Sequence, residues 1–181
     1  MTTKVDLRKK AKDTLRVLRP EELKQRSQQL EAQLLQYLFH LDHQKSLDVV
    51  GLFLALRGEP QWEERRWREV PWRLAFPAHE GEEMKYLVPR GPLPAKGPWL
   101  GVGDPCEPDL IVVPGLLFSP AGYRLGRGGG FYDRLLGKSR PVRGAIGVCF
   151  EEQLCEGIPT EAHDMKLNVI VTDRRVILCD G

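Results

Sequence analysis

Apolar residues at helical spacing mark the first part of the chain. A first stripe predicts a helix over residues 4–18. Its members are Val5, Ala11, Leu15 and Leu18. Pro20 then stands where the first turn of a helix tolerates proline, and Glu21 and Glu22 favour a helix N-terminus. A second stripe predicts a longer helix that packs against a core, with Leu23, Leu30, Leu34, Leu38 and Leu41.

Strand-like patterns follow. The run LDVVGLFLAL at residues 47–56 has strand length and predicts a strand buried on both faces of a parallel sheet. Residues 61–69 form a short amphipathic stretch, and residues 129–136 predict a further helix. The Pro- and Gly-rich residues 91–108 predict an irregular surface loop. Other strands are expected at residues 72–76, 84–88, 110–113, 142–148 and 169–172, with 175–178 as a hairpin partner of the last.

The order of these elements predicts the fold class. Strands that alternate with helices favour a parallel or mixed sheet covered by helices. We therefore expect residues 1–181 to form one domain, a Rossmann-like three-layer α/β/α sandwich. A chain of 181 residues with 41% hydrophobic content is long enough to bury one sizeable core.

Composition and charge narrow the class further. No apolar run approaches the ~20 residues that span a bilayer, and the basic N-terminal segment lacks the apolar core of a secretory signal. The four cysteines form no closely spaced pair, so free thiols in the cytoplasm are expected rather than disulfides or a zinc site. The net charge of +2 gives no reason to expect a nucleic-acid partner.

The densest chemical signal is the glycine-rich run YRLGRGGGFYD at residues 123–133. Its glycines allow the backbone to adopt positive φ and to approach a ligand closely. If a helix begins near Gly129, its free N–H groups form an anion site, and Arg124 and Arg127 add guanidinium groups that match phosphate geometry. The alternative is a tight solvent-exposed turn. The two arginines among the glycines favour phosphate binding.

Two familiar phosphate motifs do not fit this run. A dinucleotide fingerprint that starts at Gly126 would need glycine where Phe131 stands. A Walker A loop that ends in Gly137-Lys138-Ser139 would need glycine where Tyr132 stands. We interpret Gly137-Lys138-Ser139 as the end of the predicted helix, with glycine past its last turn.

Two aspartates could complete a nucleotide site with Mg²⁺. Asp133 follows the glycines directly, and Asp164 lies in a later segment, EAHDM. Nucleotide enzymes commonly hold Mg²⁺ through one or two carboxylates plus phosphate oxygens. Taken singly, each aspartate is more often a helix cap or an ion-pair partner, and sequence spacing does not show whether the fold brings the two together.

These residues resemble those of the 5-formyltetrahydrofolate cyclo-ligases, also called methenyltetrahydrofolate synthetases. The resemblance rests on DLIVVPG at residues 109–115 and on the highly specific RLGRGGGFYDR at residues 124–134. Weaker matches extend it over nearly the whole chain, at Lys4, Arg8, residues 53–59 and His163-Asp164. The resemblance implies an ATP-dependent enzyme that converts 5-formyltetrahydrofolate to 5,10-methenyltetrahydrofolate with release of ADP and phosphate.

The resemblance also implies roles for individual residues. Arg127 and Tyr132 would act at the reacting groups, Asp133 and Asp164 would hold Mg²⁺, and Glu59 would contact the folate. The ATP-binding set would be Lys4, Arg8, Arg124, Leu125, Gly126, Arg127, Gly128, Gly129, Gly130, Phe131 and Tyr132. The folate-binding set would be Leu54, Glu59, Met84, Trp99 and Phe131. For Leu54, a position in the core is an equally good interpretation.

The chain departs from the family pattern on the folate side. Ser119 stands where many members have aspartate, Pro60-Gln61-Trp62 replaces an aliphatic-Asp-Thr stretch, and residues 78–106 are shorter and richer in Gly and Pro. Two alternatives therefore stay open: an ATP-dependent enzyme for another substrate on the same scaffold, and a non-catalytic module for RNA. The nearly balanced charge opposes the second. A monomer that acts on free or polyglutamylated folate, without membrane or nucleic-acid partners, is expected.

Overall fold

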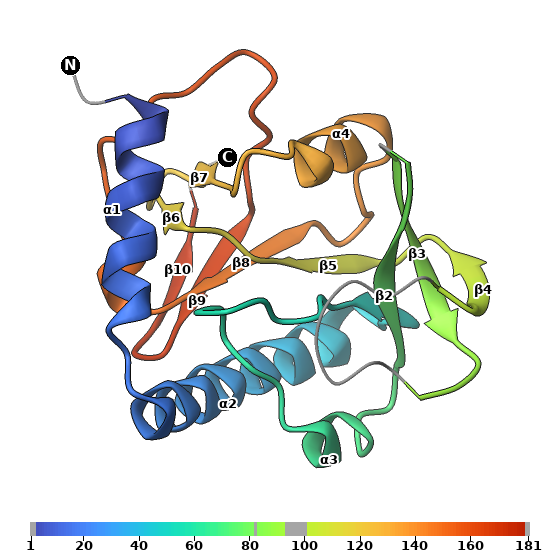
Figure 1. Cartoon of the computed structure of the whole chain (residues 1–181). Coiled ribbons are helices and arrows are strands. Elements are labelled where there is room, and N and C mark those ends of the chain that lie inside the picture. The colour runs from blue at the N-terminus through green and yellow to red at the C-terminus, as the bar shows by residue number, and fades with distance from the viewer. Residues whose placement is uncertain (1–2, 82, 93–100, 180–181) are drawn as a thin grey trace.

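The computed structural model of the chain describes residues 3–81, 83–92 and 101–179 (Figure 1). Its helices are α1 (Lys4–Arg16), α2 (Pro20–Lys45), α3 (Glu64–Trp67) and α4 (Phe131–Lys138), with the 3-10 turn η1 (Glu151–Gln153). Thr3 caps α1 in a reciprocal arrangement: its hydroxyl accepts the backbone N–H of Asp6, whose carboxylate accepts the backbone N–H of Thr3. The two N-terminal helices are confirmed, including Pro20 in the first turn of α2.

One eight-stranded sheet forms the centre of the molecule, in the order β10-β9-β8-β5-β1-β2-β3-β4. Neighbours from β9 to β2 are parallel, and the outer pairs β10–β9, β2–β3 and β3–β4 are antiparallel. A separate ribbon pairs β6 with β7. The strands are β1 (Val49–Gly51), β2 (Arg73–Glu80), β3 (Glu83–Pro89), β4 (Gly103–Cys106), β5 (Leu110–Val113), β6 (Leu117–Phe118), β7 (Arg124–Leu125), β8 (Ala145–Cys149), β9 (Val169–Thr172) and β10 (Val176–Leu178).

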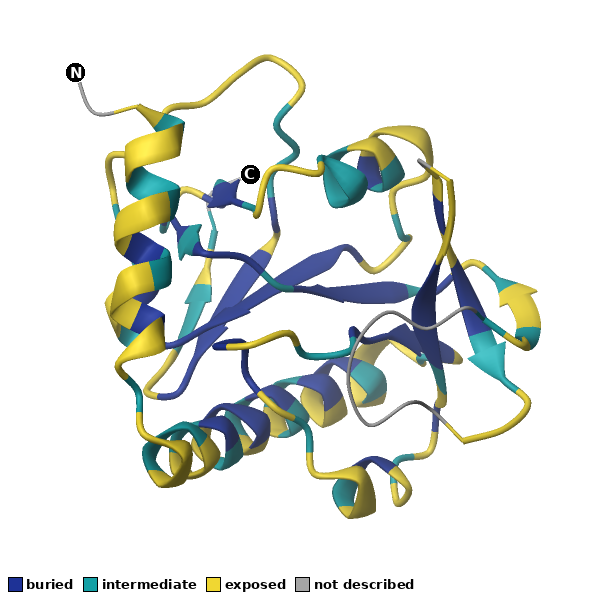
Figure 2. Cartoon of the chain, in the orientation of Figure 1, coloured by how far each residue is buried: buried dark blue, intermediate teal, exposed yellow. Residues whose placement is uncertain are grey.

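The central strands of the sheet are buried (Figure 2), and their side chains belong to two separate cores, one on each face of the sheet. Along β5, Leu110 and Val112 belong to the core with α1 and α2, whereas Ile111 and Val113 belong to the core with α4. This alternation follows from the two-residue period of a strand. In Figure 1, α2 and α3 lie below the sheet and α4 lies above it. The predicted three-layer α/β/α sandwich with a mixed, mostly parallel sheet is confirmed.

Three local predictions were wrong in their bounds. The strand expected at residues 47–56 ends at Gly51, although Leu52 and Phe53 stay about 1% exposed. The apolar pattern of residues 52–55 therefore indicated burial in the core with α2, and not pairing with a neighbouring strand. Conversely, β4 (Gly103–Cys106) lies inside the expected loop; it is an edge strand, where proline is tolerated. The helix α4 begins at Phe131 and includes Gly137 and Lys138, so it ends later than predicted.

The structure bears on the expected thiols and on membrane-spanning helices. Cys106, Cys149, Cys155 and Cys179 are all free thiols, as the sequence predicted. Among the described residues, none of the helices has both the length and the apolarity that crossing a bilayer requires.

Candidate active site

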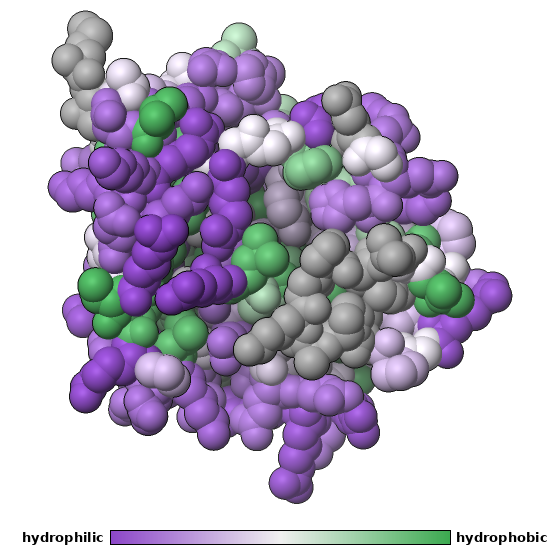
Figure 3. Space-filling view, viewed as in Figure 1, coloured by the Kyte–Doolittle hydropathy of each residue, from purple (hydrophilic) through white to green (hydrophobic). Residues whose placement is uncertain are grey.

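A cavity of about 640 Å³ opens beyond the carboxyl ends of β1 and β5. This is the edge at which parallel α/β sheets bind ligands. Its apolar wall consists of Phe53, Leu54, Leu56, Pro77 and Met84. Its charged wall consists of Lys4, Arg8, Arg124, Asp133 and Asp164, and the glycine loop (residues 126–130) runs between the two. Figure 3 shows hydrophilic residues gathered over α1 on this face, with a hydrophobic group beside them near the centre.

The glycine loop connects β7 to α4, and its glycines serve different purposes. Gly128 has φ 112° and Gly130 has φ 65°, a region in which a side chain would be strained. Gly130 is the N-cap of α4 and offers no side-chain cap, so the first N–H groups of that helix stay available. At Gly129 the reason for glycine is packing, because a Cβ at this position would lie 2.6 Å from the ring of Phe131.

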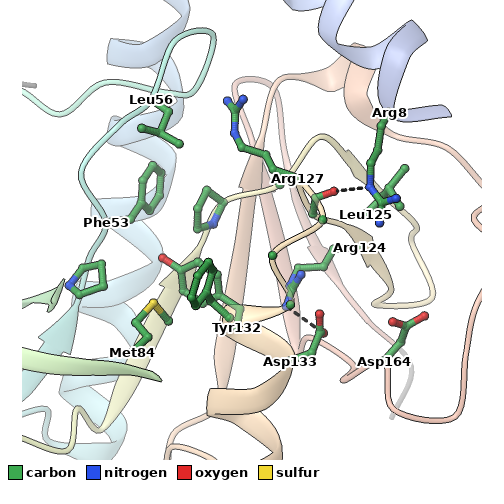
Figure 4. A pocket seen from close by; sticks show the side chains of 18 of the residues that line it. Arg8, Phe53, Leu56, Met84, Arg124, Leu125, Arg127, Tyr132, Asp133 and Asp164 are labelled. Carbon is green, nitrogen blue, oxygen red and sulfur yellow. Dashed lines mark hydrogen bonds and ion pairs between the residues drawn. The ribbon is translucent and has the colours of Figure 1, made fainter. Parts of the chain in front are cut away.

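Two arginines point in different directions here: Arg124, just before the glycine loop, and Arg127, within it (Figure 4). Arg124 is buried, and its Nη2 donates to Asp133 Oδ1 at 2.9 Å. Its guanidinium also lies 5.7 Å from the ring centre of Tyr132, and its buried Nε has no hydrogen-bond partner among the described residues. Arg127 reaches instead toward the segment that carries Leu56. Arg124 is therefore a cation of the charged wall, whereas Arg127 extends across the cavity.

Arg127 forms an ion pair with Glu59 that crosses between the two walls. Its Nε donates to Glu59 Oε1 at 2.8 Å, and its Nη2 donates to the carbonyl oxygen of Arg57 at 3.1 Å. Glu59 is only 4% exposed, and its other oxygen accepts the backbone N–H of Leu56 at 2.9 Å. The structure therefore joins a residue expected on the phosphates to one expected on the folate, which sequence spacing did not indicate.

The helix α1 docks on the opposite side of the glycine loop. Arg8 Nε donates to the carbonyl oxygen of Gly126 at 3.0 Å. Lys4 Nζ lies 2.9 Å from Asp164 Oδ2 and 3.2 Å from Glu161 Oε1. Partial burial lowers the pKa of Lys4, but its bonds to Asp164 and Glu161 outweigh burial and leave that pKa raised. The same bond leaves the pKa of Asp164 lowered although burial opposes this. Both groups are therefore charged at neutral pH.

Asp133 and Asp164, the expected metal ligands, both line the cavity. Each carboxylate already has a cationic partner, Arg124 for one and Lys4 for the other. Within the described part of the chain, no cluster of three or more His, Cys, Asp or Glu side chains could hold an ion alone. Such a pair fits the chemistry of Mg²⁺ that arrives with phosphates, because phosphate and water oxygens then supply the other ligands. The metal role stays a prediction.

Most of the residues that are expected to bind the folate line the cavity. Leu54, Met84 and Phe131 line the cavity, and Leu54 also packs against the core, so contact of Leu54 with folate stays a prediction. Trp99 lies outside the described residues. His79 also lines the cavity, although no sequence motif indicated it. It stands opposite Met84 in the β2–β3 pair, and its ring centre lies 4.7 Å from that of Phe131 in an edge-on arrangement. Pairing Met84 with its hairpin partner would have found it.

Known proteins resemble parts of this chain in sequence. A family model described as the 5-formyltetrahydrofolate cyclo-ligase family matches residues 93–173. The 5-formyltetrahydrofolate cyclo-ligase of Mycolicibacterium smegmatis is 40% identical over 45% of this chain, and the mouse protein is 41% identical over 35%. These matches span less than half of the relatives' own lengths, 42% and 33%. The Haemophilus influenzae protein is 27% identical over 77% of this chain and 83% of its own.

Solved structures extend the likeness to the whole chain. The 5,10-methenyltetrahydrofolate synthetase of Mycoplasma pneumoniae shares the fold, with a TM-score of 0.77 at 20% identity over 94% of this chain and 98% of its own. The Aquifex aeolicus 5,10-methenyltetrahydrofolate synthetase superposes with a TM-score of 0.80 at 31% identity, over 98% of this chain and 94% of its own. The chain therefore belongs to the 5-formyltetrahydrofolate cyclo-ligase family.

Proposed function

We propose that this chain uses ATP to cyclise 5-formyltetrahydrofolate to 5,10-methenyltetrahydrofolate, releasing ADP and phosphate. The observation that carries the proposal is a single cavity in which a glycine loop with a free helix N-terminus faces an apolar wall that holds a buried carboxylate. The first feature suits a polyphosphate, and the second suits a heterocycle with N–H donors. Membership of the family supports the same assignment.

The reaction needs positioning more than a covalent nucleophile. The formyl oxygen attacks the γ-phosphorus of ATP, and the bond from that phosphorus to the bridging oxygen breaks to give ADP. N10 of the folate then attacks the formyl carbon, loses its proton, and expels phosphate as the carbon–oxygen bond breaks. Catalysis of such a transfer consists mainly of alignment and neutralisation of the phosphoryl charge.

On the charged wall, the residues present can neutralise that charge. Lys4, Arg8, Arg124 and Arg127 would lie against the phosphates, with the backbone from Leu125 to Gly130 wrapping around them. Asp133 and Asp164 would hold Mg²⁺, whose charge would offset that of the phosphate oxygens. Both carboxylates are paired with cations, so bound phosphates would replace the acids as partners of those cations while Mg²⁺ would bind the acids.

On the apolar wall, Glu59 would accept N–H groups of the pterin. Leu54, Met84, Phe131 and Trp99 would contact the ring system, in keeping with the mostly apolar lining of ligand sites. Glu59 accepts two hydrogen bonds within the protein, so the pterin N–H groups would replace Arg127 as its partner.

Tyr132 lines the cavity beside Arg124 and next to Asp133. Burial raises its pKa above the usual value of 10.0, so the phenol keeps its proton at neutral pH. We assign it the role of a hydrogen-bond donor to oxygen at the junction of ATP and folate, rather than of a base. Its place at the start of α4, directly after the glycine loop, supports this role.

The decisive experiment follows the near-ultraviolet absorbance of methenyltetrahydrofolate with purified protein, ATP, Mg²⁺ and 5-formyltetrahydrofolate. We expect an ATP-dependent rise that equals the ADP released. ADP release with a different acylated heterocycle, but not with this folate, would show another enzyme on the same scaffold. No ATP turnover with any such substrate would contradict an enzymatic role.

Three further assignments belong to the same proposal. One chain supplies both walls of the cavity, which supports a monomer, and light scattering on an eluting peak measures this. The free thiols are those expected of the cytoplasm. Activity on polyglutamylated folate is measured in the same absorbance assay, by comparing substrates with different numbers of glutamates.

A further inference from the structure

Tyr86 on β3 carries a hydroxyl that the protein core does not satisfy. The residue is 2% exposed, and its Oη makes no hydrogen bond of regular geometry with the described residues. Burial of an unpaired hydroxyl is unfavourable, because the group loses its bonds to water without replacement. A phenylalanine would fill the same space without this penalty, so packing alone does not explain a tyrosine here.

A second unfavourable feature makes room for the same ring. Gly51 is the last residue of β1, a strand in the middle of the sheet. A Cβ at this position would lie 2.8 Å from Cε1 and 3.1 Å from Cζ of Tyr86. Glycine inside a strand weakens it and often marks the close approach of another group. Two departures from good local design at one place indicate a functional demand on the Tyr86 ring.

A second tyrosine, Tyr132, is a neighbour of this ring. Both tyrosines pack in the core on the α4 side of the sheet, and α4 itself packs against β3. Burial raises the pKa of Tyr86 well above its usual value, and the adjacent Tyr132 raises it further, both through its charge and as the acceptor toward which the Tyr86 O–H is directed. Cys106 contributes in the same direction. Tyr86 therefore keeps its proton and is available as a donor toward Tyr132.

Tyr132 also has charged neighbours on its other sides. These neighbours are Glu59 and Arg124, and the guanidinium of Arg124 lies 5.7 Å from the ring centre of Tyr132. Arg124 is itself held by Asp133. These contacts fix the ring of Tyr132 but leave open the direction of its O–H bond, which can rotate about the ring carbon.

We propose that Tyr86 is a positioning residue for Tyr132. Its O–H donates to the Tyr132 oxygen once substrate has drawn that hydroxyl into place, and the Tyr132 O–H then has to point into the cavity. A donated hydrogen bond also makes Tyr132 a stronger donor, because hydrogen bonds in a chain polarise one another. The inference rests on the proposed function, in which Tyr132 donates to an oxygen of the reacting groups.

The test is Y86F, with Y37F as the matched control. Tyr37 lies on α2, away from the cavity, so its loss of a hydroxyl should leave kcat unchanged. Loss of one neutral hydrogen bond corresponds to about a three- to tenfold fall in kcat for Y86F, with KM for ATP unchanged. Thermal stability should be equal to or higher than that of the wild type, because an unsatisfied buried hydroxyl is removed.

A double-mutant cycle separates positioning from structure. In the Y132F background, Y86F should have no further effect on kcat, because the hydroxyl that it orients is gone. An equal fall in both backgrounds, or unchanged kcat in Y86F alone, would overturn the proposal.

A spectroscopic measurement keeps this test separate from that of the proposed function. In protein labelled with 3-fluorotyrosine, the ¹⁹F resonance of Tyr132, assigned by its loss in Y132F, should shift in Y86F and not in Y37F when ATP and folate are bound. A wild-type protein without cyclisation activity would refute the proposed function. An unshifted resonance would refute the role of Tyr86.

Discussion

The two walls of the cavity are built on different physical terms. The charged wall consists of ion pairs: Lys4 with Asp164 at 2.9 Å, 160 residues apart in sequence, and Arg124 with Asp133 at 2.9 Å, nine residues apart. The apolar wall is an extension of the core, with Phe53 about 1% exposed at its base. One wall can exchange its partners for those of a ligand, whereas the other offers a surface that is already formed.

The difference shows where the binding energy of a ligand would be spent. Phosphates that approach the charged wall replace existing carboxylate partners, so they gain less than they would from free cations. A ring system on the apolar wall displaces water and breaks no ion pair. The Arg127–Glu59 bond is where these two regimes meet, because it ties a cation of the glycine loop to a carboxylate that is only 4% exposed.

The largest effect should come from removing the cation that crosses the cavity. R127A deletes a charge expected on the phosphoryl group and leaves Glu59 buried without its partner. We expect kcat/KM for ATP to fall by about 10²–10³-fold, as for the loss of a donor at a developing charge. R68A is the control, since Arg68 forms an exposed pair with Glu64. A change of less than about threefold would show that Arg127 only closes the apolar wall.

E59Q should separate the two walls from the other side. Glutamine keeps an acceptor for the Leu56 N–H but loses the charge that holds Arg127. We expect the affinity for 5-formyltetrahydrofolate, measured by calorimetry, to fall about 10–100-fold, the cost of a charged hydrogen bond. Affinity for a non-hydrolysable ATP analogue should stay equal or rise, because Arg127 is released. E64Q serves as control, and a fall in ATP affinity instead would make Glu59 part of the charged wall.

A smaller effect is expected from the two aspartates of the charged wall. D133N and D164N should each raise the Mg²⁺ concentration needed for half-maximal activity by about tenfold. Paramagnetic resonance of Mn²⁺ bound with ADP reports the same site without catalysis. D104N is the control, as Asp104 pairs with Arg90 on the surface. Unchanged Mn²⁺ binding in both variants would leave the aspartates as ion-pair partners alone.

The smallest effect concerns how firmly the apolar wall is anchored. Glu31 on α2 accepts the backbone N–H of Glu63 at 2.8 Å and Nε1 of Trp67 at 2.6 Å, and so holds the segment that follows the apolar wall. Burial raises its pKa above 4.5, although both hydrogen bonds and Arg66 oppose this. The folded chain therefore binds this proton more tightly than the unfolded chain, and stability from it is lost as pH rises through the raised pKa.

E31Q removes this titration while keeping the shape. Relative to E31Q, the wild type should lose about 1 kcal/mol of unfolding free energy as pH rises from 4 toward 8. Urea denaturation at each pH measures the difference. If the difference between the two proteins does not change with pH, Glu31 keeps its charge on folding, and the apolar wall does not depend on its protonation.

Much of the fold and part of the site were legible in the sequence. The leucine stripe of α2 and the continuous apolar run of β5 carry periodicity and burial, which local sequence encodes directly. The hydrophobic pattern gave wrong strand bounds where burial and strand pairing do not coincide. Leu52 and Phe53 are buried outside any strand, and β4 pairs although its sequence is Gly-Asp-Pro-Cys. Pairing depends on a neighbouring strand, which no local pattern contains.

The sequence by itself determined the glycine loop, the two arginines in and beside it, and the family to which they belong. Only the tertiary structure decided which acid each cation meets: Arg124 turns to Asp133, nine residues away, and Arg127 to Glu59, 68 residues away. It also placed His79 against Phe131 and the Tyr86 ring over Gly51. The physical reason is that a motif fixes residue types and backbone freedom, whereas the partner of a charge depends on the path of the whole chain.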